Sequence, residues 1–200
     1  MHRQYISILE EIFQIIAESA GPDQTLNRIV AFVADRFSVD VCSVYVYQPG
    51  QKRLLLKATI GLKTDRAGAI SMGVDQGLTG LVIETMRPVF VKDPASHPRY
   101  RYYAETGEEA YQTFLGLPLK YHQQILGVLV IQTRAREGIT SDHIPVFEYI
   151  ASQISATVAY TGLLDNQLQD RGPSKPGHPG TPGGPDDPGR LLSQRNYLRG

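Results

Sequence analysis

Two apolar runs within residues 114–133 form the strongest pattern along the chain. The runs FLGLPLKY and ILGVLVIQT flank the polar turn at residues 121–124, and the second run is almost wholly apolar from Ile125 to Ile131. Such a run is typical of a strand buried on both faces, so the segment predicts a hairpin at the centre of a sheet. Gly116 and Gly127 lie inside these strands, where we expect close approach by another element or a ligand.

Helical periodicity frames this hairpin at both ends of the chain. The first helix is expected to end at Gly21-Pro22, because proline cannot continue a helix. The apolar residues on its one wide face are Tyr5, Ile8, Leu9, Ile12, Ile15 and Ile16. Asp23 is expected to cap a second helix over residues 25–37. Ser141 or Asp142 is expected to cap a last long helix, with its apolar stripe on Phe147, Ile150, Ala151, Ile154, Val158, Leu164 and Leu168.

The intervening segments predict the remaining strands and one short helix. Alternation and turn residues indicate strands at 41–47, 54–60, near Ile70 and at 89–91, and a helix at 79–84. Residues 93–112 form a long polar and aromatic connection, partly helical around 105–111, and a connection of that length is usually functional.

Composition narrows the class of protein. The 200 residues carry 20 basic and 20 acidic side chains, so the neutral balance favours neither nucleic acid nor an anionic membrane as a partner. The single cysteine fits a reducing compartment. Glu10 and Glu11 interrupt the N-terminal apolar segment as no signal peptide would, and no run reaches the ~18 apolar residues of a membrane span. We therefore expect a cytoplasmic chain.

The last thirty residues differ in composition from the rest. The stretch RGPSKPGHPGTPGGPDDPGR is dense in proline and glycine and is expected to be a disordered linker. The predicted organisation is one domain over residues 1–170, followed over 171–200 by this linker and the lead-in to a further region.

No catalytic or metal-binding constellation is visible. Cys42 lies in a predicted strand and fits a buried structural thiol, while zinc and iron–sulfur sites need more thiolates. The five histidines are scattered and no nucleophile motif accompanies them. We predict no catalytic residue, metal or cofactor.

Several segments together resemble a known family. Beside the hairpin they are VCSVY at 41–45, ATIGL at 58–62, DQGLTGLV at 75–82 and DPASHPRY at 93–100. The hairpin resembles that of a GAF domain, a ligand-sensing relative of the PAS fold. The combined segments resemble the N-terminal sensor domain of nitrogen-regulatory enzyme I, a phosphoenolpyruvate–protein phosphotransferase.

The resemblance carries expectations about fold and function. It implies an α+β domain with a central, mostly antiparallel sheet of about six strands and the terminal helices packed on one face. Residues 73–112 would roof a small pocket on the other face. It also implies a parent enzyme that moves phosphate from phosphoenolpyruvate to a histidine, and glutamine as a nitrogen signal that inhibits autophosphorylation. The reductases built on GAF domains need several cysteines, so that activity is disfavoured.

The candidate ligand site combines charged and apolar residues around this pocket. Gly77 and Gly80 lie at a helix start, where free N–H groups suit a carboxylate, and Arg99 with Arg101 could clamp the same anion. The remaining candidates are Asp75, Asp93 and Glu108 for an ammonium group, and Tyr45, Val91 and Phe114 as apolar walls. The alternative is that these polar residues only cap helices and solvate a loop.

The predicted function is sensing of a small molecule, glutamine or a similar amino acid, by a regulatory domain. The alternative is a ligand-free module that only dimerises. A homodimer through the terminal helices is expected in either case, because the first helix and Val146 with Ile150 on the last offer more apolar surface than one sheet face needs.

Overall fold

The computed structural model describes residues 2–62, 70–101 and 111–170. Its helices are α1 (His2–Glu18), α2 (Pro22–Phe37), α3 (Gly77–Thr85) and α4 (Ile144–Asp170). Its strands are β1 (Val41–Gln48), β2 (Arg53–Ile60), β3 (Ser71–Gly73), β4 (Val89–Lys92), β5 (Thr113–Tyr121) and β6 (Gln124–Thr133). The predicted elements in these ranges are therefore present, with ends shifted by up to three residues. The expected helix around 105–111 and the disordered linker fall outside the described residues.

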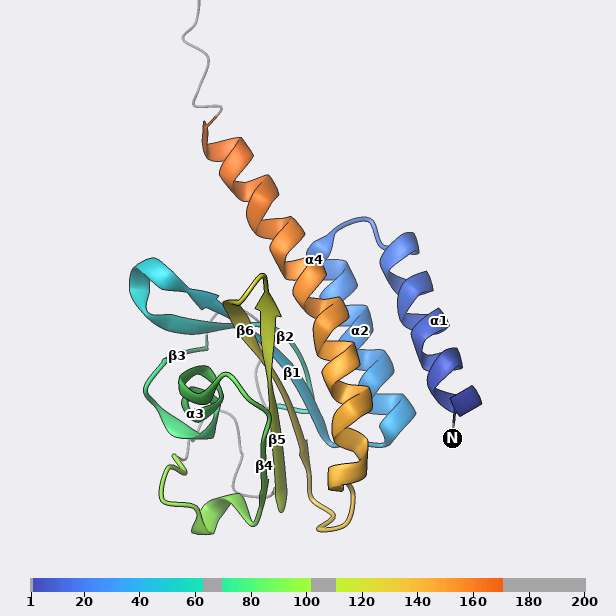
Figure 1. The fold of residues 1–200 in the computed structure, drawn as a ribbon, viewed down its shortest axis with the longest axis vertical. Helices are drawn as coiled ribbons and strands as arrows, with labels where there is room; N and C mark the ends of the chain where they lie inside the picture. The colour runs from blue at the N-terminus through green and yellow to red at the C-terminus, as the bar shows by residue number, and fades with distance from the viewer. Residues whose placement is uncertain (1, 63–69, 102–110, 171–200) are drawn as a thin grey trace, which may run out of the picture.

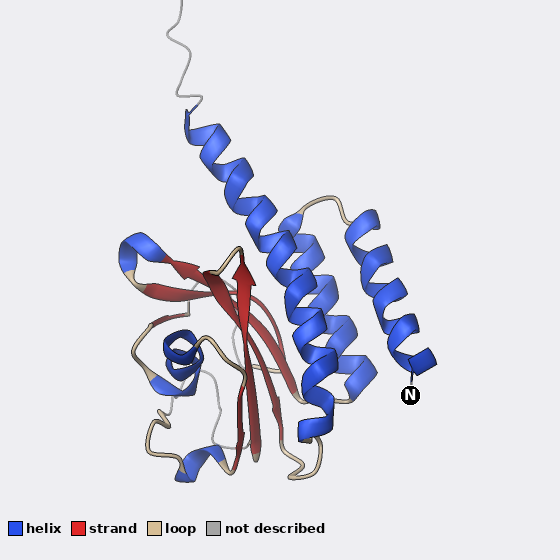
Figure 2. Cartoon of the chain, in the orientation of Figure 1, coloured by secondary structure: helices blue, strands red, loops and turns tan. Residues whose placement is uncertain are grey.

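The described strands form one antiparallel sheet in the order β3-β2-β1-β6-β5-β4. The hairpin of β5 and β6 lies in its middle, where the continuous apolar pattern placed it. Helices α2 and α4 cover one face, and α1 packs outside them (Figure 1). The short helix α3 packs on the opposite face against β5 and β6 (Figure 2). The predicted α+β architecture is confirmed.

Two apolar layers hold this arrangement together. The larger layer joins α1, α2 and α4 to one face of the sheet, with Ile12, Ile29 and Phe147 fully enclosed. The smaller layer lies between α3 and the opposite face of the sheet, around Tyr45, Leu56 and Val82. Alternate residues of β6 serve the two layers, since Leu129 and Ile131 face the helices while Val128 and Val130 face α3.

The two strand glycines mark close approaches, as the sequence predicted. A Cβ atom on Gly116 would lie 2.5 Å from Cγ2 of Val82, so α3 can rest on β5 only because that position lacks a side chain. A Cβ atom on Gly127 would lie 2.0 Å from the carbonyl oxygen of Tyr45 on the neighbouring strand β1. These glycines bring α3 and β1 close to the central hairpin.

Two details of the helices differ from the prediction. Asp23 does not cap α2, because the helix already begins at Pro22 with Gly21 at the cap position and no side-chain cap bond. At α4 the capping residue is Thr140, whose side chain accepts the third backbone N–H of the 3-10 turn Ser141–His143.

The apolar surface assigned to dimerisation is largely used inside one chain. Ile8, Ile12 and Ile15 of α1 are buried against the rest of the domain, and so are Val146 and Ile150 of α4. The argument from unused apolar surface was therefore wrong for these residues. Among the α1 side chains from Ile6 onward, the large apolar ones left exposed are Ile6 and Phe13.

Candidate functional site

A pocket opens on the face of the sheet that carries α3. Its walls come from β3, the first turn of α3, the segment that follows the 3-10 turn Pro94–Ser96, and the strands β5 and β6. The lining residues are Met72, Gln76, Gly77, Leu78, Thr79, Pro94, Tyr100, Arg101, Phe114 and Gln132. Seven of these residues, from Gln76 to Arg101, belong to the segment that was expected to roof the pocket.

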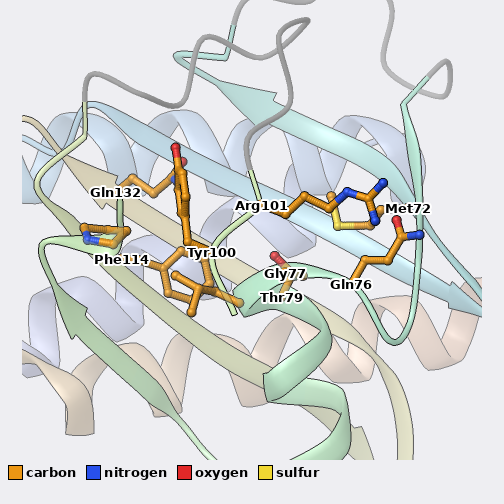
Figure 3. Close-up of a pocket in the computed structure, with 10 residues that line it drawn as sticks. Met72, Gln76, Gly77, Thr79, Tyr100, Arg101, Phe114 and Gln132 are labelled. Atoms are coloured by element: carbon orange, nitrogen blue, oxygen red, sulfur yellow. The ribbon is translucent and has the colours of Figure 1, made fainter. Parts of the chain in front are cut away.

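The pocket has two chemically different ends. In Figure 3, Arg101, Gln76 and Met72 lie at one end, and Gln132, Tyr100 and Phe114 lie at the other, with the start of α3 between them. The space amounts to about 370 Å³ when its open mouth is included.

The first turn of α3 presents an uncapped helix N-terminus to the pocket. Gln76 occupies the cap position and makes no side-chain cap bond to the helix. Gly77 has a φ of +65°, in the left-handed region that favours glycine, and this conformation turns the chain into α3. The uncapped N–H groups of such a turn attract an anion.

Gly80 has a structural role instead of a binding one. Its N–H donates to the carbonyl oxygen of Gln76 at 2.9 Å, so it is not free for a ligand. A Cβ atom on Gly80 would lie 2.7 Å from the carbonyl oxygen of Val74, so its small size lets α3 pack on the preceding turn.

The two candidate arginines lie in different surroundings. Arg101 lines the pocket, with its Cβ 3.8 Å from the position a Cβ would take on Gly77. Arg99 instead forms an ion pair with Glu84 on α3, with 2.8 Å between Nη1 and Oε2. Arg99 also donates to the carbonyl oxygen of Asp75 at 3.4 Å. It thereby ties its segment to α3 and does not line the pocket.

The structure brings only part of the predicted set together. Of the ten candidates, Gly77, Arg101 and Phe114 line the pocket. Tyr45 and Val91 belong to the same apolar layer as Phe114 without reaching the pocket. Asp75 is exposed beside Gly73, and Asp93 precedes the 3-10 turn Pro94–Ser96 with a φ of +57°. Neither residue lines the pocket. Glu108 lies outside the described residues.

Gln132 is the site residue that the sequence prediction missed. It lies near the end of β6, opposite Val41 on β1 and Phe114 on β5, and is 5% exposed. Its side-chain Oε1 is buried and has no hydrogen-bond partner, the single such atom among the side chains that the structure describes. The available signal was its position two residues after Val130, which places a polar side chain on the pocket face of an apolar strand.

The structure also bears on other kinds of site. Within residues 2–62, 70–101 and 111–170, no group of three histidine, cysteine, aspartate or glutamate side chains is arranged to hold a metal ion. In the same ranges, no helix has both the length and the apolar content needed to cross a bilayer.

Burial raises the pKa of the Cys42 thiol far above its ordinary value, as expected for a structural cysteine.

Comparison with known families decides the classification. Residues 19–159 match the family described as "GAF domain". The chain belongs to the GAF domain family. The match spans the elements from α2 to most of α4, and so includes the pocket.

Individual relatives come from two kinds of protein. The chain is 31% identical over 117 residues to the "Phosphoenolpyruvate-dependent phosphotransferase system" protein of Escherichia coli, covering 58% of this chain and 16% of that protein. It is 27% identical over 183 residues to the "Nif-specific regulatory protein" of Azospirillum lipoferum, covering 84% of this chain and 28% of that protein. The chain thus spans well under a third of either relative.

A solved structure of a phosphotransferase GAF domain has the same fold. The GAF domain from a phosphoenolpyruvate-protein phosphotransferase of Coxiella burnetii superposes with a TM-score of 0.77 at 27% identity. The superposition covers 82% of this chain and 98% of that one. The sequence resemblance to the phosphotransferase GAF domains is confirmed.

Proposed function

We propose that this GAF domain senses a small amino acid, glutamine first, and regulates phosphoenolpyruvate-dependent autophosphorylation in a phosphotransferase of the nitrogen branch. The observation that carries the proposal is the pocket on the α3 face, where an uncapped helix N-terminus lies beside Arg101. The relationship to phosphotransferase GAF domains supports the parent enzyme.

The chemistry of the pocket suits a carboxylate. Backbone N–H groups at a helix start and a guanidinium group both favour an anion, and each can donate more than one hydrogen bond. The apolar wall formed by Phe114, Leu78 and Met72 would enclose the aliphatic part of the ligand. Arg101 lines the pocket with its side chain exposed, where a ligand that enters can reach the guanidinium group.

A thermal-shift screen of amino acids and 2-oxo acids tests the proposal. A ligand at about 100 times its Kd stabilises the folded state by about 2.7 kcal/mol. For a domain of this size, that stabilisation raises Tm by about 5–10 °C. Arg101→Ala is expected to remove most of the shift, whereas Arg87→Ala, an exposed arginine beyond the end of α3, should retain it. The proposal fails if no compound raises Tm at millimolar concentration, or if the two variants behave alike.

The competing function is a ligand-free dimerisation module, and one observation favours a dimer. Ile6 and Phe13 on α1 are 53% and 66% exposed, and their seven-residue spacing places them on one face of the helix. We propose that this face packs against α1 of a second copy, with or without ligand. Light scattering at tens of micromolar should give a dimer for the wild type and for Glu11→Ser, and a monomer for Phe13→Ser. A wild-type monomer would exclude the proposed interface.

A further inference from the structure

The unpartnered oxygen of Gln132 has consequences for the type of ligand that the pocket accepts. Oε1 of this side chain is a hydrogen-bond acceptor without a donor, and the residue lines the pocket at the end away from Arg101 (Figure 3). Because a buried acceptor left unpaired destabilises a folded protein, such atoms are rare and require an explanation.

Oε1 of Gln132 accepts no hydrogen bond in the part of the chain that the structure describes, although Tyr100 and Thr79 on the pocket wall carry hydroxyl groups. The neighbours of Gln132 across the sheet are Val41 and Phe114, whose side chains carry no donor. Pro94 on the pocket wall lacks even a backbone N–H. Oε1 is therefore available as an acceptor for a donor that enters the pocket.

The backbone holds Gln132 firmly in this position. The residue is paired on both sides within the sheet, and its carbonyl oxygen accepts the N–H of Asp40 at 3.1 Å. The carboxamide consequently lies on a wall formed by the paired strands of the sheet, whereas the Arg101 side chain is exposed at the other end of the pocket. An acceptor at one end and a cation at the other suit recognition of a ligand with two different ends.

We infer that Gln132 is a specificity-determining residue, which accepts a hydrogen bond from a neutral N–H donor, such as a carboxamide, at the end of the ligand opposite its carboxylate. This inference rests on the proposed function and defines the ligand class further. An ammonium group is a poorer match, because a buried charge needs more than one neutral acceptor. A second carboxylate is disfavoured as well, because it offers only acceptors to Oε1.

Paired amino acids that differ only in this group provide the test. Isothermal titration calorimetry on the full chain would compare glutamine with glutamate and asparagine with aspartate. For the wild type, at least one amide is expected to bind about tenfold or more tightly than its acid, the worth of one well-made hydrogen bond. Gln132→Met keeps the length of the side chain without the acceptor, and should reduce that preference to near unity.

Control measurements separate a role in recognition from a role in folding. Gln132→Met should unfold at the same temperature as the wild type or higher without ligand, because it removes an unpaired buried acceptor. Gln124→Met changes an exposed glutamine on the same strand and should keep the wild-type preference.

The possible failures are distinguishable. If the wild type binds none of the four amino acids, the proposed function fails and the inference fails with it. If the wild type binds amide and acid equally, or if Gln132→Met keeps the preference, only the inference is overturned. A preference for the acids would mean that the carboxamide presents its N–H groups to the pocket, and it too would overturn the inference.

Discussion

Replacement of Gly116 by alanine tests how α3 is seated over the sheet. The added Cβ would lie 2.5 Å from Cγ2 of Val82 and 2.9 Å from Cε1 of Phe114. Val82 is fully buried and Phe114 nearly so, so neither can turn toward solvent to make room. We expect Gly116→Ala to destabilise the domain and to displace the Phe114 wall of the pocket.

The contacts set the size of the effect. Overpacking of a core costs about 1–3 kcal/mol, and restriction of the unfolded chain on replacing glycine offsets about 0.5–1 kcal/mol, which leaves about 1–2 kcal/mol. Val82→Ala removes two buried methyl groups and should cost about 2 kcal/mol, because a cavity remains. In the double variant the new methyl group occupies part of that cavity, so the total loss should fall short of the sum by about 1–2 kcal/mol.

Urea unfolding of the four proteins measures this coupling energy. The control pair is Gly116→Ala with Ile29→Val, because Ile29 is buried in the other apolar layer and its effect should add within about 0.5 kcal/mol. Additivity of Gly116→Ala and Val82→Ala to the same precision would refute the close packing of α3 on β5, and with it the position of the pocket roof.

Three smaller predictions follow from single contacts. Since burial raises the pKa of the Cys42 thiol, the folded protein should react with a disulfide reagent such as DTNB only as fast as it unfolds, and the guanidinium-unfolded chain at once. Glu84→Gln removes the ion pair between Glu84 and Arg99, whose side chains are 63% and 35% exposed respectively. Urea unfolding should therefore show a loss of unfolding free energy below about 1 kcal/mol, and this loss should disappear at about 1 M salt. Asp40→Ala removes the acceptor for the N–H of Arg134 at 2.7 Å and should cost about 1–2 kcal/mol in the same assay, with Asp40→Asn less damaging.

The elements of the fold could be predicted from the sequence because most of them have a strong local pattern. The hairpin of β5 and β6 combines long apolar runs with a short polar turn, and these features do not depend on the rest of the chain. Gly116 and Gly127 were recognised as close approaches for a similarly local reason, since glycine within a strand needs a cause.

The partners of each element were harder to predict. The apolar face of α1 is equally suited to a second chain or to the layer formed by α2 and α4, and periodicity does not distinguish them. The structure places Ile8, Ile12 and Ile15 in the intramolecular layer. The cap of α2 was misassigned because Asp23 is a common capping residue, whereas Pro22 is equally favoured at the first helical position.

Prediction of the site depended on loop geometry that the sequence does not contain. Arg99 and Arg101 are two residues apart and chemically identical, yet one pairs with Glu84 and the other lines the pocket. Gln132 was overlooked because a polar residue after an apolar run normally marks the end of a strand. Its burial results from pairing with Phe114 in the same hairpin and with Val41 of β1, and Val41 is far away in the sequence.

The treatment of other buried polar groups argues that Gln132 is retained for binding. Where the fold encloses hydroxyl groups between strands it pairs them: Ser43 with Thr59 at 2.7 Å, and Thr113 with Thr133 at 2.6 Å. The same sheet therefore satisfies polar side chains by cross-strand partners, and a threonine or serine opposite Gln132 would have served equally well. Instead an unpaired acceptor persists on the central strand, at the pocket beneath an uncapped helix start. An apolar residue in its place would stabilise the unliganded fold, so its presence is best explained by a donor that arrives with the ligand.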